Sequence, residues 1–140
     1  MIVLDTNVLS EFVRPAPSPE VVRWAAGEPA SSLFTTIITQ AEVLYGIELM
    51  PHGKRRVALE SKAQSMFELY FPNRILPFDF DAAQAFARIA AARRALGLPI
   101  SPLDAQIAAI ALSRGAKLAT RDIADFEHCG VPLVNPWKTR

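Results

Sequence analysis

Short apolar runs alternate along this chain with longer stretches that have a helical, amphipathic pattern. The short runs are rich in β-branched or aliphatic residues and predict strands at 2–4, 33–36, 74–78, 117–120 and 131–134. The longer stretches begin or end at Pro, Ser, Asp or Gly and predict helices over 8–13, 19–26, 40–49, 54–71, 81–96 and 103–113, with a helical turn at 123–127. Strands that alternate with helices predict an α/β domain with a mostly parallel central sheet flanked by helices.

Several acidic residues lie where a helix is expected to begin. Three pairs have a Ser, Thr or Asp followed three residues later by an acid, a spacing typical of helix caps. The pairs are Thr39 with Glu42, Ser101 with Asp104, and Asp122 with Asp125. Asp81 is expected to cap the alanine-rich helix that ends before Gly97. Each of these acids therefore has a structural explanation beside any functional one.

Length and composition narrow the class of protein. A chain of 140 residues with 51% hydrophobic content predicts one domain spanning 1–140. No leader sequence and no apolar stretch long enough to cross a membrane is evident, so we expect a soluble, cytoplasmic protein. Cys129 is the single cysteine, which excludes an internal disulfide and a thiolate metal cluster. The net charge of +1 excludes a strongly basic nucleic-acid binder, so any contact with nucleic acid must be local.

Four acids share one kind of location. Asp5 follows the first predicted strand, Asp122 lies two residues after the strand at 117–120, and Glu42 and Asp104 each lie in the first turn of a predicted helix. In parallel sheets such groups gather at the carboxyl ends of the strands. Asp5 stands out because a carboxylate at the end of a buried strand needs a partner that offsets its desolvation, and no basic residue is near it in sequence.

A divalent cation would allow these acids to lie together. Without it, their mutual repulsion would raise some of their pKa values. Oxygen ligands select Mg²⁺ or Mn²⁺ over Zn²⁺, and His52 and His128 are expected to be exposed loop residues rather than ligands. Mg²⁺ commonly joins carboxylates to phosphate oxygens, so the set fits hydrolysis of a phosphodiester with one or two ions. Thr6, Asn7 and Thr120 either orient the acids or stabilise turns.

Five ordered segments give the chain a family resemblance over nearly its whole length. They are 1–10 (MIVLDTNVLS), 38–46 (ITQAEVLYG), 104–109 (DAQIAA), 119–126 (ATRDIADF) and 135–137 (NPW). In these segments the chain resembles the PIN-domain nucleases, and among them the VapC-type toxins of bacterial toxin–antitoxin pairs, especially the FitB-like branch. The resemblance implies a PIN-like three-layer sandwich, dependence on Mg²⁺ or Mn²⁺, endonucleolytic cleavage of RNA, dimerisation, and inhibition by a small VapB-type antitoxin.

The resemblance also assigns roles to individual acids. It implies that Asp5, Glu42, Asp104 and Asp122 form the catalytic, metal-binding set, with Asp5 and Asp104 as direct ligands. The fourth position stays open, because many relatives have Asn where this chain has Asp122 and keep the later acid. Asp125 is therefore a ligand, a supporting group or a cap.

Contacts with RNA and with a partner have several candidates. Basic residues that either bind phosphates or are ordinary exposed charges are Lys54, Arg55, Arg56, Arg93, Arg94 and Arg121. Arg121 is the best candidate because it adjoins Asp122, and single-stranded or loop RNA is the favoured substrate. The antitoxin is expected to insert a basic side chain, an Arg, into the acidic site. The apolar Met66, Phe67, Tyr70 and Phe71 belong either to a partner or dimer surface or to the core.

Other classes of protein share parts of this pattern. A haloacid-dehalogenase-like phosphatase also places an Asp at a strand end and uses Mg²⁺, but its pattern needs a second acid where this chain has Asn7. A receiver-like signalling domain would need a central phosphoacceptor Asp and a later Lys, and neither is evident. A catalytically inactive PIN-like binding module, in which the acids only cap helices, is the alternative from a different class.

Overall fold

The computed structural model describes residues 1–138, which fold around a five-stranded sheet in the order β3-β2-β1-β4-β5. The strands are β1 (Ile2–Leu4), β2 (Leu33–Thr36), β3 (Ile75–Leu76), β4 (Lys117–Ala119) and β5 (Leu133–Val134). Every pairing between these strands is parallel, which confirms the α/β prediction and goes beyond the mostly parallel sheet that was expected. The carboxyl end of the central strand β1 leads directly into Asp5.

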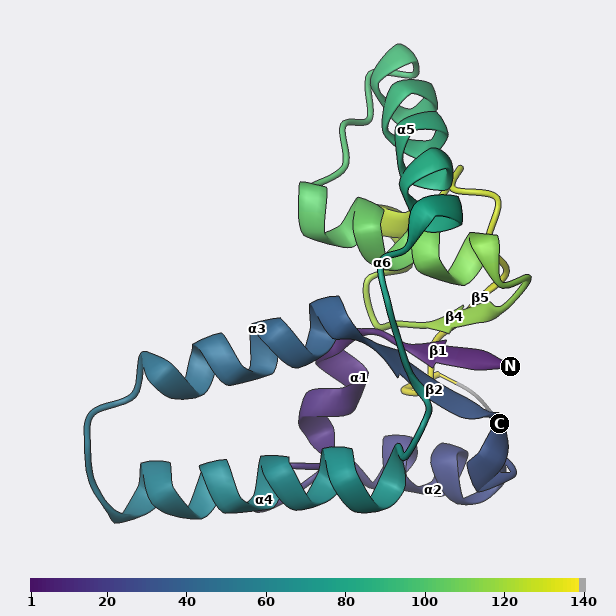
Figure 1. Ribbon diagram of the computed structural model, residues 1–140. Coiled ribbons are helices and arrows are strands. Elements are labelled where there is room, and N and C mark those ends of the chain that lie inside the picture. Colours follow the sequence, from purple (N-terminus) through teal and green to yellow (C-terminus); the bar gives the residue numbers. More distant parts are fainter. Residues whose placement is uncertain (139–140) are drawn as a thin grey trace.

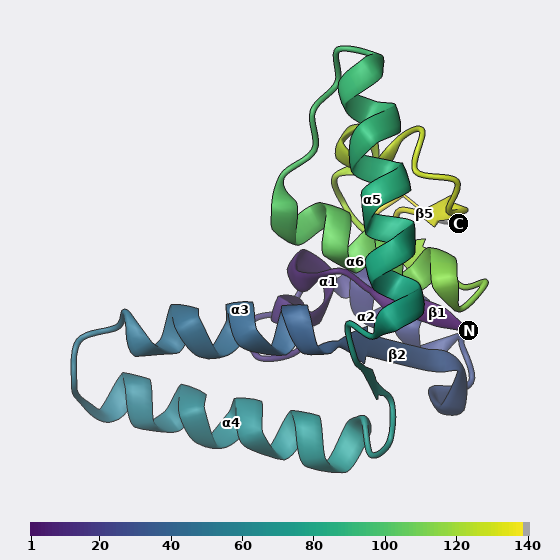
Figure 2. The same ribbon diagram turned by 45° about the horizontal axis from the view of Figure 1, so that its top comes forward.

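Helices cover both faces of this sheet. They are α1 (Thr6–Glu11), α2 (Pro19–Ala26), α3 (Ile37–Glu48), α4 (Lys54–Tyr70), α5 (Phe80–Ala95) and α6 (Pro102–Ser113), with short 3₁₀ helices η1 (Ala30–Ser32) and η2 (Ile123–Phe126). In Figure 1, α5 and α6 lie on one face, and α1 and α2 lie on the other. The antiparallel helices α3 and α4 extend together beyond the sheet, as the turned view in Figure 2 also shows. Within residues 1–138, no helix combines the length and the apolar character needed to cross a membrane.

Two buried clusters fill the space between the three layers. Val3 and Leu118 belong to the cluster under α5 and α6, whereas Leu4 and Ala119 belong to the cluster under α1, α2 and α4. Neighbouring residues of a strand point to opposite faces, so β1 and β4 each serve both clusters. Both faces of the central strands are thereby buried, which explains why these strands are apolar without alternation.

Two helices, α3 and α5, are capped by residues earlier in the chain than those predicted. Thr36, still in extended conformation at the end of β2, caps α3 because its hydroxyl accepts a hydrogen bond from the N–H of Thr39 at 3.0 Å. Asp79 caps α5 in the same way through the N–H of Ala82 at 3.0 Å. The predictions that Thr39 and Asp81 are the caps were wrong, because both residues already lie within the first turn.

The other two cap predictions had opposite outcomes. Ser101 caps α6, since its hydroxyl accepts a hydrogen bond from the N–H of Asp104 at 3.3 Å. Asp122 lies at the N-cap position of η2 but makes no side-chain cap hydrogen bond, so the prediction of a capping side chain was wrong there. The Asp122 carboxylate instead accepts a hydrogen bond from Asn7, at the beginning of α1.

Candidate active site

Asp5 lies at the centre of the candidate site, at the carboxyl end of β1. Its extended backbone ends the strand and begins α1. Its carboxylate is 5% exposed and accepts two hydrogen bonds, from the N–H of Thr6 at 2.8 Å and from the hydroxyl of Thr120 at 2.7 Å. No Lys, Arg or His of residues 1–138 forms an ion pair with it. No basic residue elsewhere in the described part of the chain therefore neutralises the charge of Asp5.

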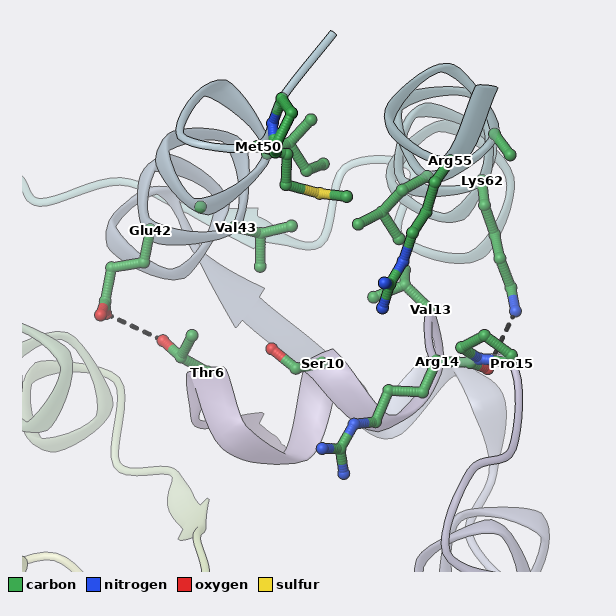
Figure 3. A pocket seen from close by; sticks show the side chains of 15 residues that line it. Thr6, Ser10, Val13, Arg14, Pro15, Glu42, Val43, Met50, Arg55 and Lys62 are labelled. Carbon is green, nitrogen blue, oxygen red and sulfur yellow. Dashed lines mark hydrogen bonds between the residues drawn. The ribbon is translucent and has the colours of Figure 1, made fainter. Parts of the chain in front are cut away.

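Glu42 joins this edge from α3. The Thr6 hydroxyl donates to Glu42 Oε1 at 2.9 Å, a contact drawn in Figure 3, and lies 3.0 Å from the hydroxyl of Thr39. Because a hydroxyl has one proton, Thr6 accepts the proton of Thr39 when it donates to Glu42. The side chain of Glu42 is thus held against the beginning of α1 by two threonines. The role of Thr39 was missed in the sequence, where it was interpreted only as a cap.

Asp122 joins the same network from the segment that follows β4. The side-chain amide of Asn7 donates to Asp122 Oδ2 at 3.0 Å, and its carbonyl accepts from the N–H of Arg121 at 3.4 Å. The N–H of Asp122 donates to the Thr120 hydroxyl at 3.0 Å, and that hydroxyl donates to Asp5. Thr120 therefore connects Asp5 to Asp122. Asn7 fixes the carboxylate of Asp122.

Asp104 lies at the N-terminus of α6 and is coupled to the other acids through charge. The pKa of Asp5 is raised to about 6, chiefly by burial, while hydrogen bonds from Thr120 and Thr6 lower it and the charges of Asp104 and Glu42 raise it further. The pKa of Asp104 is also raised, first by burial and then by the charges of Asp125 and Asp122. The acids predicted from the sequence therefore lie close enough together to repel one another.

The acids do not form a ready metal-binding cluster. Among residues 1–138, no group of three His, Cys, Asp or Glu side chains converges on a common point. The donors are nevertheless all oxygen, and both histidines are exposed, as expected. One buried carboxylate, Asp5, with the partly exposed Glu42 and Asp104 near it suits a hard divalent cation, which would offset the desolvation and repulsion that raise the pKa values of Asp5 and Asp104.

The basic residues predicted to bind phosphates divide into two groups. Arg56 and Arg93 are buried, so their interpretation as phosphate contacts was wrong: Arg56 pairs with Glu48 and Glu60, and Arg93 donates to the carbonyl of Glu127 at 2.6 Å. The exposed group consists of Lys54, Arg55, Arg94 and Arg121.

The structure also places Trp137 near the site and the apolar residues at 66–71, at the end of α4. The Arg121 guanidinium lies over the ring of Trp137, 4.9 Å from its centroid, in a cation–π contact that the NPW segment alone did not predict. Met66, Phe67 and Phe71 of the predicted partner surface are buried and belong to the core, while Tyr70 is exposed. The choice between core and surface that the sequence left open is thus settled residue by residue.

Comparison with known proteins gives this geometry a family. The family model for the PIN domain matches residues 2–130. The plasmid stability protein StbB of Pseudomonas syringae pv. tomato is 43% identical over 99% of both chains. The VapC ribonuclease Y4jK of Sinorhizobium fredii is 38% identical over 99% of both chains. The toxin FitB of Neisseria gonorrhoeae is 36% identical over 98% of this chain and 99% of its own.

Solved structures agree with the sequence relatives. The structure of FitAB bound to an IR36 DNA fragment matches with a TM-score of 0.93 at 36% identity, covering 100% of this chain and 98% of that chain. The crystal structure of FitAcB from Neisseria gonorrhoeae matches with a TM-score of 0.92 at 36% identity, covering 99% and 100%. The expected PIN-like sandwich is therefore confirmed. On the family match, these relatives and the shared fold, the chain belongs to the PIN-domain family.

Proposed function

We propose that this protein is a Mg²⁺-dependent endoribonuclease that acts as the toxin of a toxin–antitoxin pair. The observation that carries the proposal is Asp5, a buried carboxylate that has no cationic partner among residues 1–138 and lies among three other acids. A fold rarely keeps such a charge without a function, because burying it costs free energy. A divalent cation bound to the acids would offset that cost.

By analogy with the PIN-domain family, we assign each acid a role in metal binding, and the hydrogen bonds support the roles of the residues that orient these acids. Asp5 and Asp104 would hold Mg²⁺, or Mn²⁺ in its place, with Glu42 and Asp122 completing the acidic set and Asp125 the alternative to Asp122. Bound Mg²⁺ would supply a Lewis acid for the phosphate and a water of lowered pKa. Thr120 and the N–H of Thr6 orient Asp5 through both of its oxygens.

Glu42 and Asp122 have their own supporting groups. The Thr6 hydroxyl directs Glu42 toward the end of β1, and the Asn7 amide does the same for Asp122. Each of these side chains is fixed by a neighbour on α1, so one short helix aligns acids that come from α3 and from the segment after β4. This alignment supports the roles of Thr6, Asn7 and Thr120 as orienting groups.

The relatives support the biological setting. One relative is named a VapC ribonuclease and another is named a toxin, FitB, whose complex FitAB has been solved with a DNA fragment. By analogy we assign to this protein an RNA substrate and a VapB-type antitoxin that covers the acidic site with an Arg side chain. A homodimer, a higher assembly with the antitoxin, and a cytoplasmic location remain predictions.

The geometry disfavours the alternative enzyme. A phosphatase of the haloacid-dehalogenase type needs an acid two residues after Asp5, and Asn7 occupies that position with its amide bonded to Asp122. An inactive binding module would need acids that only cap helices. Asp5 is the N-cap of α1 and Asp104 lies in the first turn of α6, so helix capping explains these two acids. It does not explain Asp122, which makes no side-chain cap hydrogen bond, or Glu42, which lies beyond the first turn of α3.

The test is RNA cleavage by purified protein freed of antitoxin. Cellular RNA is incubated with protein in Mg²⁺, in Mn²⁺ and in EDTA, and the Asp5→Asn variant is compared with Asp81→Asn, which neutralises an exposed acid of α5 outside the network. We expect cleavage in either metal, none in EDTA, and loss only in Asp5→Asn. Metal-independent cleavage, or a fully active Asp5→Asn protein, would contradict the proposal.

A further inference from the structure

A groove leads away from the acidic site between α1, α3 and α4. Its cavity volume is about 790 Å³, in the range of cavities that take organic ligands. Thr6 and Glu42 lie at one side, so the groove is continuous with the acidic network (Figure 3). A second cavity, of about 380 Å³, lies between α2 and α4 and contains none of the site acids.

The walls of this groove combine two chemistries. Apolar side chains line its middle, and these are Val13, Val43, Ile47, Met50 and Leu59. Cationic side chains line the side opposite Glu42: Arg55 and Lys62 descend from α4, and Arg14 lies after α1 (Figure 3). A polymer with apolar faces and a regularly charged anionic backbone matches both chemistries. Single-stranded RNA is such a polymer.

Two of the three cations are available to a ligand. Arg14 is paired with Glu11 at 2.7 Å. Arg55 and Lys62 form no ion pair within residues 1–138, and Lys62 donates only to the carbonyl of Arg14, at 3.1 Å. The buried Arg56 next to Arg55 ties α3 to α4 through Glu48 and Glu60, which holds the wall of the groove in place.

We infer that this groove binds the stretch of single-stranded RNA adjacent to the scissile phosphate, with Arg55 and Lys62 contacting its phosphates. The inference rests on the proposed function, because an endonuclease cuts within a strand and the strand must leave the acidic site along the surface. The groove, which Thr6 and Glu42 line at one side, provides that exit. Bases stack or pack on the apolar middle, and the phosphates face the cations.

The same surface would also accept a segment of protein with apolar and acidic side chains, such as part of an antitoxin. The pattern favours RNA, because the two available cations stand on one wall and the apolar residues form the floor between them and the acids. That arrangement suits a strand whose phosphates lie on one side and whose bases lie on the other. The protein partner is an outcome that the experiment separates.

The experiment compares two double variants that remove the same charge. Arg55→Gln/Lys62→Gln changes the groove, and Arg23→Gln/Arg88→Gln changes two exposed cations, of α2 and α5, outside it. Binding of a fluorescein-labelled, mixed-sequence single-stranded RNA is measured by anisotropy at several salt concentrations, with Asp5→Asn present in every protein to prevent cleavage. Cleavage kinetics are measured without Asp5→Asn, and circular dichroism melts establish that each variant folds.

The expected result is specific to the groove. The groove variant should bind RNA about tenfold more weakly and show a KM about tenfold higher with kcat nearly unchanged. Its salt dependence should lose about 0.7 in slope for each cation removed, and the control variant should match the parent protein. A stability defect alone would not change the salt slope.

Two outcomes would overturn the inference. The first is equal RNA binding and equal salt slopes in the two folded variants. If the parent protein still cleaved RNA, the proposed function would stand although the inference about the groove failed. Normal RNA binding by the groove variant combined with weakened binding of the co-expressed antitoxin would assign the groove to the protein partner instead. Absence of RNA cleavage by the parent protein would reject the proposed function itself.

Discussion

Two buried charged side chains, Arg56 and Asp5, differ in the partners that the fold provides for them. At the turn between α3 and α4, Arg56 donates to Glu60 at 2.8 Å, to Glu48 at 2.9 Å and to the carbonyl of Met50 at 3.2 Å. At the carboxyl end of β1, Asp5 is more deeply buried than Arg56 and receives two hydrogen bonds but no ion pair from residues 1–138. The charge at the helical turn is matched within the described fold, and the one at the strand end is not.

The difference separates structural charge from functional charge. Arg56 recovers its desolvation cost through partners on both helices, so it joins them. Asp5 recovers only part of that cost, and its pKa rises to about 6 as a result. A group that weakens its own fold near neutral pH is expected to act on something outside the chain. Each prediction below tests this contrast.

The largest effect is expected from Asp5→Asn. Because Asp5 is the proposed direct metal ligand, the variant should cleave RNA slower by a factor on the order of 10³ while remaining folded. Initial rates in Mg²⁺ and thermal melts in EDTA give the two readouts. A variant that lost activity only because it unfolded would make Asp5 a structural charge like Arg56.

The pH dependence of stability is the second effect. The pKa of Asp5 is about 6 in the folded protein against the ordinary 3.8, so the folded state binds the proton more tightly. The contribution of Asp5 therefore favours the fold at low pH and is lost as the pH rises through about 6, on the order of 3 kcal/mol in total. The raised pKa of Asp104 acts in the same direction.

Urea unfolding in EDTA measures this contribution as a difference between proteins. Asp5→Asn should equal the parent protein at about pH 4 and exceed its free energy of unfolding at about pH 7, because the variant carries no charge to bury. Saturating Mg²⁺ should raise the melting temperature of the parent protein at about pH 7 and leave Asp5→Asn almost unchanged. A constant difference across pH would show that Asp5 does not titrate as described.

The sequence identified the acids and three groups that hydrogen-bond to them, Thr6, Asn7 and Thr120, but it did not show which acid each group contacts. Asp5 could be identified because strand and acid are adjacent in sequence. Thr39 and Asp122 were misjudged because cap spacing is local, whereas the partners of these residues are Thr6 and Asn7, on another element. Arg56 and Arg93 were assigned to the surface for the same reason, since sequence shows charge and not the carboxylates or carbonyls that the fold brings to it.

The third effect concerns Arg56, the buried charge that has ion-pair partners. Arg56→Gln removes both ion pairs and should lower the free energy of unfolding, by less than loss of a fully buried pair would because Glu48 and Glu60 are themselves exposed. Lys54→Gln is the matched control, because Lys54 lies two residues before Arg56 in α4 and forms no ion pair within residues 1–138. It should change the free energy of unfolding by less than about 0.5 kcal/mol.

Activity distinguishes this variant from Asp5→Asn. Folded Arg56→Gln protein should retain kcat within a few-fold, because Arg56 contacts Glu48 and Glu60 and none of the four acids of the candidate site. If Arg56→Gln abolished cleavage in a protein that still melted cooperatively, the helical turn would belong to the active site. The contrast between the two charges would then fail.

The smallest effect distinguishes the two candidates for the fourth acid. Asp122 is fixed by the Asn7 amide at 3.0 Å and is connected to Asp5 through Thr120, whereas Asp125 influences Asp104 through charge alone. Asp122→Asn should therefore reduce cleavage more than Asp125→Asn does, and the latter should lower the rate by no more than a few-fold, mainly through a lower pKa of Asp104. Rates measured across pH at saturating Mg²⁺ separate a ligand from a remote charge, since loss of a remote charge shifts the profile and loss of a ligand lowers it at every pH. The opposite ranking would assign the fourth position to Asp125 and leave Asp122 as an orienting group.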